Sequence, residues 1–177
     1  YTLTEGTTPA EIIANIRAGK AAMCGAFGTG EKLAEDVWLC MQGEFERRPH
    51  PPLAHLDGEW VSLSFGPFPW GGALVVPKNA EKPVPLVIAQ HGIGSTPEKT
   101  FGVHDPTDGY HAYGKALVEA GFAVFAPMNL RSGERRTYIE NLCRLASTSL
   151  PGIEVVCIQR LLDHVLADPR IDGERVG

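Results

Sequence analysis

The stretch that decides the fold is Val84-Pro-Leu-Val-Ile-Ala-Gln-His-Gly-Ile-Gly-Ser-Thr96. Its first half, Leu86 to Gln90, is a run of apolar or small residues that leads directly into His91-Gly92-Ile93-Gly94. A short apolar run bounded by proline and glycine is typical of a strand buried on both faces. The glycines after it allow backbone N–H groups to face a concave space. Such a turn is either an ordinary strand-to-helix connection or an oxyanion hole, whose N–H donors stabilise negative charge in a transition state.

A helix and a second apolar run follow this stretch. Residues 97–112 are predicted to form a polar loop, which is longer than most connections in compact domains. Helical spacing then relates four residues, Tyr113, Ala116, Leu117 and Ala120. Gly121 stands where helices commonly end, and Phe122 to Ala126 is predicted to be a buried strand. Strand, helix and strand with short joins indicate a right-handed parallel crossover.

Further elements are predicted on both sides. Val61, Leu63 and Phe65 alternate with serines, which indicates a half-buried strand, and 73–76 is predicted to pair with it as a hairpin after a turn at 66–72. Residues 131–149 are predicted to be irregular. A long helix with one broad apolar face is predicted to begin at Pro151, and 175–177 are predicted to begin one more strand. The order predicts an α/β domain with a mixed, mainly parallel sheet that is incomplete in this chain.

The first fifty residues differ from the rest. Thr8-Pro-Ala-Glu11 forms a capping box with proline at the first helical position, and apolar stripes at helical spacing follow it. We therefore expect 1–50 to be a helical extension that packs on the main domain, 51–177, although a partner-binding arm would show the same stripes.

Composition excludes several classes of function. The chain has 177 residues, 44% of them hydrophobic, and a net charge of −5 without any basic cluster, so no nucleic-acid partner is predicted. No apolar run approaches the ~20 residues that span a bilayer, so no membrane partner is predicted. Its four cysteines form no CxxC pair, and the sequence fixes neither their disulfide status nor a compartment. The cysteines are Cys24, Cys40, Cys143 and Cys157. Cys40 and Cys157 lie on apolar helical stripes, which is typical of buried small hydrophobes and not of reactive thiols.

The carboxyl ends of the two buried strands mark the candidate site, because sheets of this class bind ligands beyond those ends. The first end carries His91 to Gly94, and the second carries Asn129 and Arg131, which are predicted to line a substrate pocket. The loop from His104 to His111 holds two histidines and two aspartates, but their spacing fits no zinc motif. No metal site and no cofactor are predicted.

Four segments in this order resemble the α/β-hydrolase family, in the branch of dienelactone hydrolases and acetyl xylan esterases. They are 85–94, 113–127, 130–135 and 161–177. The family's nucleophile is a serine in a G-x-S-x-G turn, and its acid and histidine follow later in the chain. This sequence contains no G-x-S-x-G. The resemblance therefore implies that the triad lies beyond residue 177, and that this chain is inactive without the remaining C-terminal part of the same domain.

The resemblance also implies roles for residues that are present. The backbone N–H of Ile93 matches the family's oxyanion-hole donor, Gly92 and Gly94 permit the backbone to approach the substrate, and His91 braces the loop by hydrogen bonding. The implied activity is hydrolysis of a small carboxylic ester by a serine hydrolase. Two alternatives stay open: a non-catalytic binding module on the same scaffold, and a peptidase of the same fold.

Overall fold

The computed structural model describes residues 56–65, 68–103, 106–107, 109–130, 133–145 and 148–177. The predicted helical extension over 1–50 lies outside them. The described residues fall into two compact units. One holds most of the sheet and comprises 56–63, 71–130 and 158–177. The other comprises 64–70 and 133–157.

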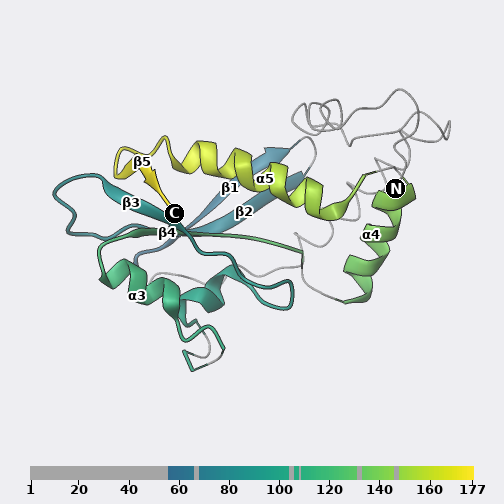
Figure 1. The fold of residues 1–177 in the computed structure, drawn as a ribbon, viewed down its shortest axis with the longest axis horizontal. Helices are drawn as coiled ribbons and strands as arrows, with labels where there is room; N and C mark the ends of the chain where they lie inside the picture. Colours follow the sequence, from purple (N-terminus) through teal and green to yellow (C-terminus); the bar gives the residue numbers. More distant parts are fainter. Residues whose placement is uncertain (1–55, 66–67, 104–105, 108, 131–132, 146–147) are drawn as a thin grey trace. The chain divides into compact units, whose positions relative to one another are not determined.

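Five strands form one sheet in the order β1-β2-β4-β3-β5. They are β1 (Glu59–Phe65), β2 (Phe68–Val75), β3 (Val84–Ile88), β4 (Ala123–Pro127) and β5 (Ile171–Val176). β3 runs parallel to β4 and to β5, whereas β2 runs antiparallel to β4. The predicted mixed, mainly parallel sheet is confirmed, with β5 at its edge (Figure 1).

Two strands begin earlier than the sequence predicted. β2 starts at Phe68, inside the predicted turn, because Gly71 and Gly72 serve a close approach and not a reversal of the chain. A Cβ on Gly71 would lie 2.5 Å from Trp60 Nε1, and a Cβ on Gly72 would lie 2.6 Å from Phe125 Cε2. β5 starts at Ile171 and not at Arg175, since pairing with β3 organises a segment that is mostly polar.

The two faces of the sheet are covered by different helices. On one face, alternate residues of β2 and β4 pack with Phe101 of η3 (Pro97–Phe101) and with Leu117 of α3 (Tyr113–Glu119). These alternate residues are Ala73, Val75, Val124 and Ala126. Leu74 points to the opposite face, where it lines a pocket together with Val165 at the end of α5 (Leu150–Val165). α3 and the end of α5 therefore lie on opposite faces of the sheet (Figure 1).

The predicted polar loop over 97–112 is corrected in part. Its first residues form η3, and Phe101 is fully buried in the core under the sheet. A single aromatic residue among polar neighbours has no periodicity, so the sequence pattern did not indicate this contact.

Burial of the two central strands also differs from the prediction. β4 is buried along its whole length, as expected, but in β3 only the central Leu86 is fully buried. The reason is that α3 packs mainly against β4 and buries that strand more completely than β3.

The crossover between β3 and β4 ends as predicted. Gly121 has φ +93°, its N–H donates to Val118 O, and the N–H of Phe122 donates to Leu117 O. This pair of bonds is the Schellman motif, which only a residue tolerant of positive φ can close. The glycine thus turns the chain from α3 directly into β4.

The second unit contains α4 (Glu134–Leu145) and the first part of α5. Our prediction of an irregular segment over 131–149 was wrong, because α4 carries a buried stripe at helical spacing, Ile139, Leu142 and Cys143, among charged residues. Arg136 of α4 forms a two-pronged ion pair with Glu154 of α5, at 2.8 and 3.1 Å, and also contacts Glu140 at 2.9 Å. Arg136 and Glu154 are both buried.

Candidate active site

The topology makes the carboxyl ends of β3 and β4 the candidate ligand site. The chain leaves β3 toward η3 and α3 on one face, and it leaves β4 toward the elements that return through α5 on the other. Neighbouring strands whose connections diverge in this way form a topological switch point, where α/β sheets bind ligands. The loop His91–Gly94 follows β3 at this point, and Asn129 follows β4.

Side chains from both strand ends hold the first part of this loop. Asn129 donates from Nδ2 to the carbonyl of His91 at 3.2 Å, and Gln90 donates from Nε2 to the same carbonyl at 3.0 Å. Asn129 is buried, and its bond joins the end of β4 to the end of β3. The residue predicted to line a substrate pocket therefore supports the loop itself.

The loop leaves two backbone donors unused, the N–H groups of Ile93 and Gly94. Among the described residues, nothing accepts a hydrogen bond from Ile93 N–H or Gly94 N–H. The N–H of Gly92 is engaged, because it donates to the hydroxyl of Tyr110 at 2.9 Å, and the carbonyl of Gly92 accepts from Ser95 N–H at 2.9 Å. Ile93 itself is 46% exposed. The loop is thus held by hydrogen bonds on both sides of an exposed residue whose N–H is unused.

Two tyrosines from the neighbouring segment complete this frame. Tyr113, the first residue of α3, donates its hydroxyl to Gln90 O at 2.9 Å, and its ring lies 6.4 Å from the ring of Tyr110. Burial of the Tyr113 hydroxyl and the nearby Tyr110 both raise the pKa of Tyr113 above its ordinary value. The phenol therefore stays protonated, and remains a donor, through the whole neutral range.

His91 and Ser95 are buried polar residues in the same loop. His91 Nδ1 lies 2.9 Å from Gly92 O, a carbonyl that accepts from an Nδ1–H. This contact is compatible with the bracing role predicted for His91. Ser95 is 5% exposed, and its Oγ has no hydrogen-bond partner among the described residues. A hydroxyl so enclosed is poorly placed to attack a substrate, in line with the absence of a G-x-S-x-G pattern around it.

Other predicted positions lie outside the described residues or gather no chemistry. Arg131 is outside them, as are His104, Asp105 and Asp108 of the loop considered for metal binding. Among the residues that the structure does describe, no group of three or more His, Cys, Asp or Glu side chains could hold a metal ion. The described helices include none that is long and apolar enough to cross a membrane.

Cys143 and Cys157 are buried free thiols in the second unit, and the prediction that Cys157 is a buried small hydrophobe is confirmed. Burial raises the pKa of Cys143 to about 12 and raises that of Cys157 as well. Thiols with such pKa values carry almost no thiolate at neutral pH, so neither residue is a nucleophile.

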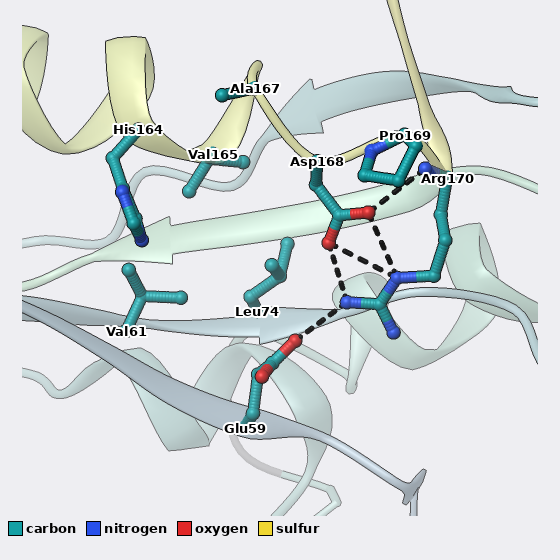
Figure 2. Close-up of a pocket in the computed structure, with 9 residues that line it drawn as sticks. All are labelled: Glu59, Val61, Leu74, His164, Val165, Ala167, Asp168, Pro169 and Arg170. Carbon is teal, nitrogen blue, oxygen red and sulfur yellow. Dashed lines mark hydrogen bonds and ion pairs between the residues drawn. The ribbon is translucent and has the colours of Figure 1, made fainter.

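A separate hollow of about 440 Å³ lies at the other end of the sheet (Figure 2). Its apolar floor comes from β1, β2 and the end of α5, through residues such as Val61, Leu74 and Val165. At its rim, Arg170 pairs with Asp168 and with Glu59, as the dashed lines in Figure 2 show. Arg170 immediately precedes β5, so this hollow adjoins the amino end of a parallel strand. Ligand sites of such sheets lie at the carboxyl ends.

No family model matches the chain, and no curated protein matches it. Solved structures do. A Bacteroides fragilis protein assigned as an acetyl xylan esterase matches with a TM-score of 0.54 and 16% identity, over 80% of this chain and 45% of that one. At this identity the likeness establishes the fold alone. The predicted α/β-hydrolase-type fold is confirmed.

Two further solved structures match with TM-scores below 0.5. A dienelactone hydrolase-like promiscuous phosphotriesterase from metagenomic libraries matches with 18% identity and a TM-score of 0.46, over 67% of this chain and 46% of that one. The thermophilic carboxylesterase EstE1 from a metagenomic library matches with 12% identity and a TM-score of 0.44, over 84% and 43%. The chain spans less than half the length of each of these three proteins.

The contacts that Tyr110 and Tyr113 make with the loop that carries Ile93 were not predicted from the sequence. Tyr113 was recognised only as a helical residue, and Tyr110 as part of a polar loop. Their hydroxyls lie 18 and 23 residues away along the chain from the backbone groups they contact. The signal that could have found them is the presence of two aromatic hydroxyls where the chain enters the crossover helix.

Proposed function

We propose that this chain belongs to a serine hydrolase that cleaves small carboxylic esters. The observation that carries the proposal is the unused N–H of Ile93, held in a braced loop at the switch point of an α/β-hydrolase-type sheet. A donor in this place would bind the oxygen that becomes negatively charged when a nucleophile attacks the ester carbonyl. Removing one such donor typically lowers kcat by about 10²–10³.

The nucleophile, the acid and the catalytic histidine belong, in this proposal, to sequence that follows Gly177 in the native protein. β5 ends at Val176, and its carboxyl end lies beside that of β3, since Ile88 N–H donates to Gly177 O at 2.8 Å. A serine on a tight turn after β5 would therefore stand next to the loop that holds Ile93. Its own following N–H would supply the second donor.

The test compares the native full-length protein with the 177-residue chain. We expect the full-length protein to hydrolyse p-nitrophenyl acetate and to react with a fluorophosphonate label at a serine after Gly177, and the 177-residue chain to do neither. A full-length protein that lacks G-x-S-x-G and takes no label would contradict the proposal and favour the non-catalytic binding module. Labelling of a serine within the 177 residues would contradict the proposal that the nucleophile follows Gly177.

A further inference from the structure

The loop that carries Ile93 is held by two phenol hydroxyls that no sequence motif of the site includes. Tyr110 lies in the connection before α3, and Tyr113 is the first residue of that helix. Tyr110 accepts from Gly92 N–H, directly before Ile93, whereas Tyr113 donates to Gln90 O, two residues earlier. The two contacts thus hold a donor and an acceptor that lie two residues apart on the same backbone.

We propose that Tyr110 and Tyr113 are positioning residues for the oxyanion loop, an inference that rests on the proposed function. By engaging Gly92 N–H and Gln90 O, the two hydroxyls fix the backbone on the near side of Ile93, so that the Ile93 N–H keeps one direction. Preorganised donors are effective because they need no reorientation when charge develops. Misplacing such a group by about 1 Å can cost on the order of 100-fold in rate.

The two rings act as one unit. Their centroids are 6.4 Å apart with an angle of 34° between the planes, which is within the range of favourable aromatic pairs. Gly92 is also matched to this arrangement, since a Cβ at this position would lie 3.3 Å from the Tyr110 hydroxyl. A side chain there would press on the phenol that accepts from the same residue's N–H. Glycine is thus the residue that lets the hydroxyl reach the backbone.

The experiment uses Tyr110→Phe and Tyr113→Phe in the full-length protein, because each removes only a hydroxyl and keeps the ring packing. Tyr138→Phe is the matched control, since Tyr138 is exposed on α4 and its hydroxyl makes no bond among the described residues. The first readout is amide hydrogen exchange by NMR. We expect Tyr110→Phe to accelerate exchange at Gly92 N–H by about tenfold, because this N–H loses its hydrogen bond to the phenol. Tyr138→Phe should leave the exchange unchanged.

The second readout is the hydrolysis of p-nitrophenyl acetate. We expect both variants to lose at least about tenfold in kcat with KM changed less than twofold, since the loop donor acts on the transition state and not on the bound ester. Unchanged exchange at Gly92, or exchange that accelerates while kcat stays at the level of the Tyr138→Phe control, overturns the inference. If the parent protein takes no label and hydrolyses no ester, the proposed function fails, and the exchange readout still decides whether the tyrosines hold the loop.

Discussion

Single glycines in β2 show how one residue sets the local geometry of this sheet. A Cβ on Gly72 would lie 2.6 Å from Phe125 Cε2 and 2.7 Å from the backbone oxygen of Ala126. The ring could shift, but the backbone oxygen belongs to β4, the strand to which β2 is hydrogen-bonded. Glycine at this position therefore allows the two strands to pair over a fully buried aromatic ring.

We predict that Gly72→Ala destabilises the protein by about 3 kcal/mol, the upper part of the range for overpacked sites, because the contact is with backbone as well as ring. Gly173→Ala in β5 is the control, since its Cβ would meet only Leu166 O at 4.0 Å. That control is expected to be neutral or to stabilise by up to about 1 kcal/mol. Urea unfolding monitored by circular dichroism measures both, and equal midpoints for the two variants would refute the prediction.

At the scale of elements, α4 and α5 are joined by the buried pair of Arg136 and Glu154. Their side chains are 7% and 8% exposed. The carboxylates of Glu154 and Glu140 raise the pKa of Arg136, although burial acts in the opposite direction. The guanidinium stays charged in any case, so the pair is ionic at all pH values where the carboxylates are ionised.

Replacing one member of this pair is expected to lower the free energy of unfolding more than replacing both members. Arg136→Met leaves the buried Glu154 carboxylate without its ionic partner and should destabilise the protein by about 3–5 kcal/mol. The double variant Arg136→Met with Glu154→Met should recover much of that loss, because the buried Glu154 carboxylate is removed as well and the other acidic contact of Arg136, Glu140, is partly exposed. Arg144→Met, on an exposed position of the same helix, is the control and should stay within about 0.5 kcal/mol.

The measurement for this pair is thermal and urea unfolding of the parent and the three variants in parallel. A double variant as unstable as Arg136→Met alone would mean that packing, and not charge, dominates at this site.

The same two helices show which elements could be predicted from the sequence. The periodic stripe of α5 was found because its apolar residues are frequent, whereas α4 was missed because charged residues surround its shorter stripe.

At the scale of the whole molecule, ion pairs at the β5 end of the sheet make stability depend on pH. Hydrogen bonds from the Arg170 side chain lower the pKa of Asp168, and a bond from Arg175 lowers that of Asp172. A carboxyl with a lowered folded-state pKa adds stability above its unfolded pKa of about 3.9, and this contribution is lost as the pH falls through the folded-state pKa. Both pairs are at the surface, so salt screens them.

We therefore predict that Asp168→Asn lowers the melting temperature at pH 7 and has little effect at pH 2. The melting temperature of the variant should then fall less steeply between pH 7 and pH 2 than that of the parent. The control is Asp163→Asn, an exposed residue of α5 whose side chain makes no bond among the described residues. Scanning calorimetry between pH 2 and 7, at low and at high salt, measures the effect. If the melting temperatures of Asp168→Asn and the parent differed by the same amount at every pH, Asp168 would not be a source of the pH dependence.

The sequence by itself determined the elements that repeat a pattern: the alternation of β1, the apolar runs of β3 and β4, the stripe of α5 and the glycine that ends α3. Local propensity and periodicity fix these, and together with the order of the motifs they indicate the α/β class. The loop of Ile93 and its glycines was also singled out from the sequence, and the role that the family resemblance implies for it stays a prediction.

Only the tertiary structure decided which groups surround that loop. The hydroxyls of Tyr110 and Tyr113 and the amide of Asn129 contact it across distances along the chain that no local pattern encodes. The burial of the Phe101 ring in the core depends on tertiary packing in the same way. The same holds for Gly71 and Gly72, which resemble a turn in sequence but are required by rings on neighbouring strands. Periodicity reports what each residue does within its own element, whereas these contacts depend on how the elements pack.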